Sequence, residues 1–144
     1  METSMIEKLD KSRYELLKWF TVGWGMWYGG FILKDLISSK LILGLILLVG
    51  LVGGVIFAVN LIRFRRFAKI VNSDSDLKNA LNDELMLHNR NKSYTVGYWV
   101  LIIVTGIFML TSIYTDISAL IVCEVILYIG ILSVLVSSLR YNKD

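Results

Sequence analysis

The sequence predicts an all-α membrane protein, a bundle of four transmembrane helices with both chain ends in the cytoplasm. Its main indication is three long stretches, residues 41–62, 93–115 and 117–139, that carry no charged side chain except Glu124. A helix needs roughly 20 apolar residues to cross the hydrocarbon core, and each stretch is that long. A fourth uncharged run, residues 19–33, is shorter and of borderline length.

Composition supports the same class. Of the 144 residues, 56% are hydrophobic and 19% are charged, and the mean hydropathy is +0.64. Soluble domains have about 25% charged residues. A bundle of four spans uses the whole chain, so we expect a single membrane domain over residues 1–144.

The predicted elements follow in chain order. Residues 3–18 have apolar side chains near one face, which predicts an amphipathic helix along the inner membrane surface or an extension of the first span. The uncharged part of the first span covers only ~22 Å at 1.5 Å per residue, so Lys34 must reach outward or find a partner. The predicted spans are residues 16–37, 39–62, 94–114 and 118–139, with a helical cytoplasmic segment, 63–93, between the second and third.

The cytoplasmic segment is predicted to be helical for most of its length. The second span should continue as helix through Arg65 and Arg66. Asn72-Ser73-Asp74-Ser75 is the best helix start in the chain, because such residues cap free N–H groups. Leu77, Leu81 and Leu85 then recur at helical spacing, and without Gly or Pro this helix can run directly into the third span.

Basic residues predict the orientation. Lys and Arg concentrate in cytoplasmic loops, and here they precede the first span, separate the second from the third and follow the fourth. Only Lys34 and Lys40 lie near the other side. We therefore expect a multi-pass protein of the inner (plasma) membrane, with both termini and the segment 63–93 in the cytoplasm.

Glu124 is the most unusual residue, because a carboxylate within a span is costly and usually has a partner. Counted from the inner ends of their spans, Lys34 and Glu124 lie at the same depth, which predicts an intramembrane pair between the first and fourth spans. Asp35 competes for Lys34. The alternative is that Glu124 handles a proton or cation.

Small and aromatic residues mark faces of the first two spans. Gly25 and Gly29, and likewise Gly50 and Gly54, form G-x-x-x-G patterns that let helix backbones approach closely. They predict either packing of the first span on the second or contact between copies of the chain. A stripe on another face of the first span, Phe20, Trp24, Trp27 and Phe31, is expected to face lipid or a neighbouring subunit.

A basic run lies just inside the second span. It consists of Arg63, Arg65, Arg66 and Lys69. Each cation near an anionic leaflet contributes about 1 kcal/mol of attraction, so this run sets the orientation or binds anionic lipid. It is too short and too close to the membrane to predict nucleic-acid binding.

The densest polar cluster precedes the third span and includes Asp83, Glu84, His88 and Arg90. On a helix these side chains form a solvated face, which is our candidate contact for a soluble partner. The order Asp-Glu, then Asn-x-Lys, then an aromatic-rich span resembles uncharacterised small four-span bacterial membrane proteins with a D-E…K segment before a span. The resemblance covers the region around residues 80–105 and implies placement in a bacterial membrane, with no assigned chemistry.

The two halves of the chain share a short motif. Lys18-Trp19-Phe20-Thr21-Val22-Gly23-Trp24 is similar to the segment from Lys92 to Tyr98, and each begins an odd-numbered span. Duplication of a two-span hairpin would produce the match, as would a shared need for interfacial Lys and aromatic residues.

No catalytic motif is present, and one His with one distant Cys makes no metal set, so we expect no enzyme, cofactor or metal. The predicted function is a non-enzymatic membrane interaction protein, a homo-oligomer that acts as regulatory anchor, accessory subunit or membrane effector through its cytoplasmic segment. The alternative is an oligomeric ion channel or small transporter that uses Glu124.

Overall fold

A computed structural model describes residues 2–34, 37–75, 79 and 84–142. The described part is helical apart from short connections. Its four long helices are α1 (Glu2–Leu33), α2 (Lys40–Asn72), α4 (Glu84–Thr111) and α5 (Ala119–Tyr141).

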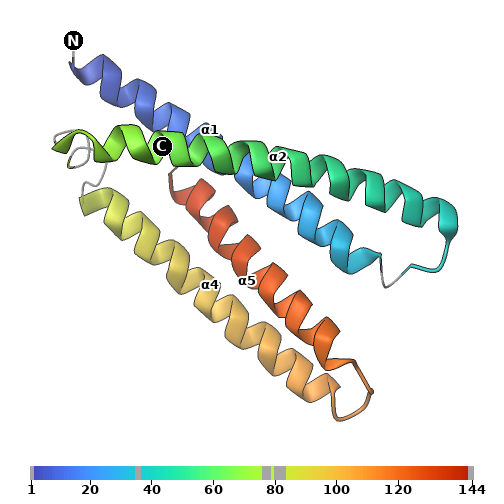
Figure 1. Ribbon diagram of the computed structural model, residues 1–144. Helices are drawn as coiled ribbons and strands as arrows, with labels where there is room; N and C mark the ends of the chain where they lie inside the picture. The colour runs from blue at the N-terminus through green and yellow to red at the C-terminus, as the bar shows by residue number, and fades with distance from the viewer. Residues whose placement is uncertain (1, 35–36, 76–78, 80–83, 143–144) are drawn as a thin grey trace.

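The four helices form two antiparallel hairpins, α1–α2 and α4–α5 (Figure 1). The hairpins pack on each other through α1 and α5, so that the helices follow one another in space as α2, α1, α5, α4. They diverge toward the ends that carry the two tight connections, and approach at the end that holds both termini. The arrangement is therefore more open than the expected four-helix bundle.

Three helices, α2, α4 and α5, are long and apolar enough to cross a membrane. This finding indicates a membrane protein. By the same criterion α1 does not qualify, because charges fill its first half, while Trp, Tyr and Gly replace aliphatic residues in its second half. Three of the four expected spans therefore satisfy the criterion of length and composition, and α1 does not.

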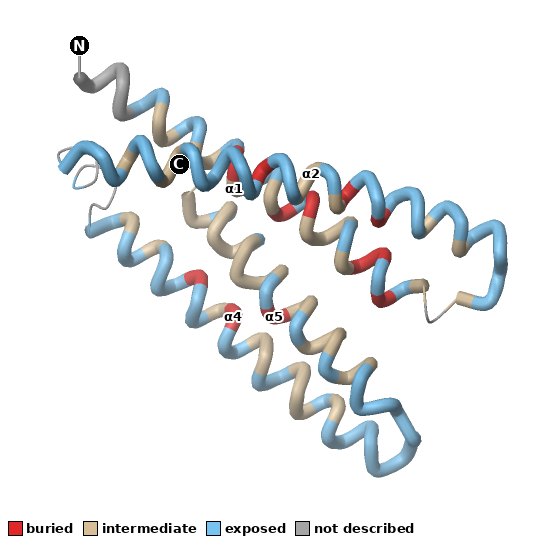
Figure 2. The backbone as a smooth tube through the Cα atoms, viewed as in Figure 1, coloured by how far each residue is buried: buried red, intermediate tan, exposed pale blue. Residues whose placement is uncertain are grey.

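Large apolar side chains cover the outside of the molecule, and the buried residues are mainly small. Leu41 is 75% exposed and Leu51 is 69% exposed, both on α2. Figure 2 shows buried residues as short patches where neighbouring helices meet, and many of these residues are glycines. An apolar surface around an interior of small residues is typical of a protein surrounded by lipid. In lipid, helices associate by close packing of small residues rather than by burial of large side chains.

The middle of the chain follows the sequence prediction in part. α2 continues past Arg65 and Arg66 to Asn72, and α4 runs unbroken from Glu84 into the third apolar stretch, as expected. The segment 72–75, expected as a helix start, also holds the end of α2, because the Ser73 N–H donates to the carbonyl oxygens of Ile70 and Lys69. Helical backbone resumes at Ser75. Leu77, Leu81 and Asp83 lie outside the described residues.

Glycines allow α1 and α2 to approach backbone to backbone. A Cβ placed on Gly53 would lie 2.5 Å from the Cβ of Met26 and 2.6 Å from the backbone N of Trp27. A Cβ on Gly23 would lie 2.7 Å from the backbone N of Phe57. Any side chain at these positions forces the helices apart, so this hairpin depends on glycine.

The second hairpin makes corresponding contacts. Gly97, which matches Gly23 in the repeated motif, lies against Val134 of α5 as Gly23 lies against α2. One turn further, Gly130 lies against Leu101, as Gly53 lies against Trp27. These equivalent glycines support duplication of a hairpin better than the seven-residue motif alone.

Candidate functional site

Three helices are much longer than is needed to cross a membrane, and the extra turns of all three lie at the same end of the molecule. α2 has 33 residues and is about 50 Å long at 1.5 Å per residue, against roughly 30 Å of hydrocarbon. α1 has 32 residues and α4 has 28. The start of α1, the end of α2, the start of α4 and the end of α5 lie at the same end of the molecule (Figure 1), which we call the polar end. It comprises residues 2–18, 63–75, 84–93 and 138–142.

The basic run of α2 belongs to the polar end and is solvent-facing. Arg63, Arg65, Arg66 and Lys69 are all exposed, and none forms an ion pair with another described residue. By contrast, two basic residues of α1 pair within their own helix: the Arg13 Nη2 lies 2.8 Å from the Asp10 Oδ1, and the Lys18 Nζ lies 3.9 Å from the Glu15 Oε1. The α2 cations are therefore available to lipid or a partner.

Side chains in the first turns of α4 contact the C-terminal end of α5. The side-chain amide of Asn89 donates a hydrogen bond of 2.9 Å to the carbonyl oxygen of Tyr141, and the Lys92 ammonium lies 5.7 Å from the centre of the Tyr141 ring. Ser93 is only 1% exposed and donates to the Asn89 carbonyl oxygen. The contacts of Asn89 and Lys92 with Tyr141 hold the start of α4 beside the C-terminal end of α5.

The predicted partner-contact residues lie on this fastened segment. Glu84, His88 and Arg90 are exposed on α4, while Asp83 lies outside the described residues. The structure thus presents three of the four side chains to solvent at the polar end. No three His, Cys, Asp or Glu side chains gather as metal ligands anywhere in the described ranges.

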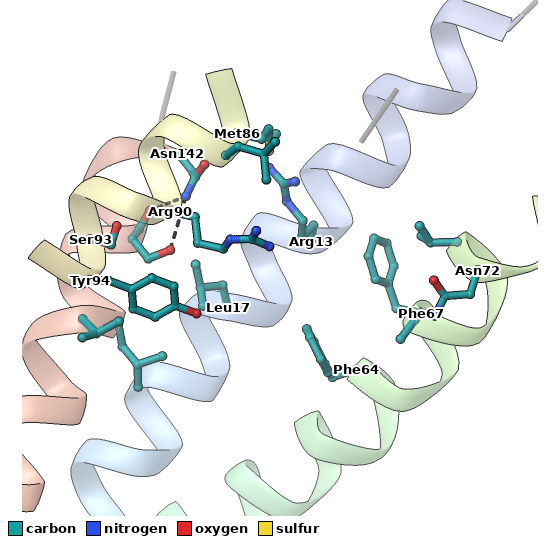
Figure 3. A pocket seen from close by; sticks show the side chains of 16 residues that line it. Arg13, Leu17, Phe64, Phe67, Asn72, Met86, Arg90, Ser93, Tyr94 and Asn142 are labelled. Carbon is teal, nitrogen blue, oxygen red and sulfur yellow. Dashed lines mark hydrogen bonds between the residues drawn. The ribbon is translucent and has the colours of Figure 1, made fainter. Parts of the chain in front are cut away.

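A cavity of about 440 Å³ opens at the inner edge of the polar end (Figure 3). All four helices contribute to its walls. Figure 3 shows Arg90 extending from α4 toward α1, where Arg13 lies, with Phe64 and Phe67 of α2 on the opposite wall. Sequence reasoning missed Arg13 as a site residue, because in the sequence it is one of several charges on an amphipathic helix.

Lys34 and Glu124 lie near the other end of the molecule. The Lys34 ammonium lies 4.0 Å from the centre of the Phe31 ring. Glu124 is half-buried on α5, and no ion pair joins it to Lys34 or to another residue of the described part. The two residues are not brought together here, so their pairing stays a prediction. The competitor Asp35 lies outside the described residues.

The G-x-x-x-G glycines face different helices. Gly25 and Gly29 lie against Tyr128 of α5, whose hydroxyl donates a hydrogen bond of 3.2 Å to the Gly25 carbonyl oxygen. Gly50 lies against Gly30, and Gly54 lies against the Trp27 ring. All four glycines therefore take part in helix contacts within the chain.

Part of the aromatic stripe also packs within the chain, which corrects the expectation that it faces lipid or another subunit. Phe20, Trp24 and Trp27 surround Phe57 of α2, with ring centres 4.7, 5.7 and 5.3 Å away. Only the outer edge remains open, since Trp27 is 41% and Phe31 is 44% exposed.

Comparison of the chain with protein-family models, with curated proteins and with solved structures gives no match. The chemistry of the polar end therefore carries the functional assignment.

Proposed function

We propose that this protein is a non-enzymatic integral membrane interaction protein that acts through its polar end. The observation behind the proposal is that α1, α2 and α4 extend well beyond a membrane's thickness at one end, where they present charged side chains on a fastened helical support. A charged helix end outside the bilayer offers contacts for a soluble protein. An anchor, an accessory subunit or a membrane effector would each use such an end.

We propose further that α1 is the fourth span and that the polar end lies in the cytoplasm. α1 packs along the apolar half of α2 with backbone contacts at Gly23 and Gly53, so α1 must cross wherever α2 crosses. The exposed cations of α2 lie at the polar end, and the positive-inside rule assigns that end to the cytoplasm. A bacterial inner membrane fits this orientation.

We infer that copies of the chain associate within the bilayer. α2 and α4 each pack along one neighbouring helix of the described part, which leaves their outer apolar faces to lipid or to another copy. In lipid, helices associate through shape and small residues rather than through burial from water. A homo-oligomer would also bring several polar ends together.

The first test is site-specific photo-crosslinking in living cells. A photoreactive amino acid at His88, which is exposed at the polar end, should give a discrete crosslink to a soluble cytoplasmic protein or to a second copy of the chain. The measurement is the mass and identity of the product on a denaturing gel.

The matched control is Tyr114, which is 86% exposed in the connection between α4 and α5. The same amino acid there should capture no cytoplasmic protein, because that connection lies outside. Capture from Tyr114 but not from His88 would invert the orientation, and capture from neither would remove the interaction proposal.

A second candidate function is an oligomeric ion channel or small transporter, and Glu124 favours it. A half-buried carboxylate within a candidate span, without an ion-pair partner among the described residues, is typical of an ion pathway. Four helices are few for a pore, so several copies would surround it.

Liposomes that contain only this protein separate the two candidates. The interaction proposal expects no proton or cation flux above that of empty liposomes. The channel expects a flux that falls at least about tenfold in Glu124→Gln and persists in Asp116→Asn, a carboxylate change in the exposed outer connection. Measured flux with this pattern would replace the first proposal by the second.

A further inference from the structure

The cavity at the polar end has the chemistry of a site for an amphiphilic anion. Its described lining includes two arginines, Arg13 and Arg90, and no carboxylate. Hydroxyl and amide side chains, among them Ser138 and Asn142, also line it, and Phe64 and Phe67 form an apolar wall (Figure 3). Guanidinium groups on one side and aromatic rings on the other match a ligand that has an anionic headgroup and a hydrocarbon chain.

The two arginines come from different hairpins, Arg13 from α1 and Arg90 from α4. A guanidinium offers five N–H donors in a planar fork that suits phosphate oxygens, and the Arg13 Nη2 already lies 2.8 Å from the Asp10 Oδ1. Burial lowers the pKa of Arg13 from its ordinary value, and the nearby Asp10 carboxylate opposes that shift. A cation that is partly removed from water gains from a bound anion.

In the proposed membrane placement, the cavity lies at the depth of lipid headgroups. Arg63 and Arg65 flank Phe64 on α2, and Lys92 precedes Ser93 and Tyr94 on α4, so the lining begins where the charged segments meet the apolar spans. Its walls include both α2 and α4, which make no extended contact with each other in the described part. A lipid from the surrounding leaflet can therefore approach between these two helices.

We propose that this cavity binds one anionic phospholipid, with its phosphate between Arg13 and Arg90 and the start of an acyl chain along Phe64 and Phe67. The proposal rests on the membrane placement proposed above and does not depend on a soluble partner. A lipid held by both hairpins would join α1 to α4 at the polar end.

The test uses the full purified chain in a neutral detergent, titrated with phosphatidylglycerol or phosphatidylcholine and observed by native mass spectrometry. We expect one tightly retained phosphatidylglycerol per chain and weaker retention of phosphatidylcholine. Loss of one cation at about 1 kcal/mol corresponds to roughly fivefold weaker binding, so Arg90→Gln should weaken retention about fivefold and the double variant with Arg13→Gln about 30-fold.

Lys40→Gln is the matched control, because Lys40 is an exposed cation at the other end of α2 and does not line the cavity. It should retain the lipid unchanged. Ala68→Phe, which fills the cavity and keeps both arginines, should also weaken retention, and helix content by circular dichroism confirms that each variant is folded.

Three results would overturn the proposal. Equal loss in Lys40→Gln would show non-specific attraction to any surface cation, and equal retention of phosphatidylcholine would show an apolar groove without anion recognition. Displacement of the lipid by millimolar inorganic phosphate, with binding of phosphate alone, would assign the arginines to a soluble anion. None of these results depends on whether His88 captures a cytoplasmic partner.

Discussion

Replacing Gly53 by alanine should destabilise the protein by about 1–3 kcal/mol, the usual cost of forcing extra volume into a packed interface. The added Cβ would lie 2.5 Å from the Met26 Cβ and 2.6 Å from the Trp27 backbone N, and backbone atoms cannot move aside as the end of a side chain can. α1 and α2 must separate along their contact. Reversible unfolding of the purified protein in mixed detergent micelles, followed by helix content, measures the change.

Gly44→Ala is the control on the same helix, because no atom lies within 4 Å of a Cβ built at Gly44. It should leave the free energy of unfolding unchanged or raise it slightly, since alanine favours helix more than glycine does. Equal effects of the two changes would mean that glycine acts through helix propensity alone, and the close approach of α1 and α2 would then be wrong.

Replacing Tyr128 by alanine should loosen the contact between the two hairpins. Its ring stacks on Tyr28 at 6.0 Å, and its hydroxyl bonds the Gly25 carbonyl oxygen. Removing a buried ring from a soluble core costs 3–5 kcal/mol, and for this half-buried ring we expect about 2–3 kcal/mol. Tyr128→Phe keeps the ring and should lose only about 0.6 kcal/mol, the average for an interhelical hydrogen bond in a membrane.

The control for Tyr128 is its neighbour Leu127, which is 54% exposed on α5. Leu127→Ala should change the free energy of unfolding by less than about 0.5 kcal/mol, because its side chain lies on the surface. A Tyr128→Ala protein as stable as the Leu127→Ala protein would contradict the role assigned to the α1–α5 contact. The two variants are compared by the same unfolding measurement as Gly53→Ala.

Local patterns predicted the helices well. Uncharged stretches indicated α2, α4 and α5, and the absence of Gly and Pro before the third stretch indicated that α4 runs through without a break. The segment 72–75, where a helix start was predicted, also holds the end of α2, because Ser73 donates its N–H to the last turn of α2, and helical backbone resumes at Ser75. The residue types predicted the helix start but not that α2 ends in the same segment.

Helix partners were harder to predict. The G-x-x-x-G spacing of Gly25 and Gly29 correctly marks one face of α1, but spacing does not say which helix covers that face, and the structure places α5 there. The closest backbone contacts use Gly23 and Gly53, which are not part of the G-x-x-x-G motifs. The seven-residue spacing of Gly23 and Gly30 on one face was the available signal.

The amino-acid sequence by itself determined that the chain is helical, that three of its helices are apolar enough to cross a membrane, and where its charges concentrate. These properties add up residue by residue along a continuous segment. Only the tertiary structure decided the spatial order α2, α1, α5, α4 and the cavity that joins Arg13 to Arg90. Apolar helix faces are solvated equally well by lipid and by other helices, so hydrophobicity does not decide which helices pack together. The shape complementarity between segments that are distant in the sequence decides it.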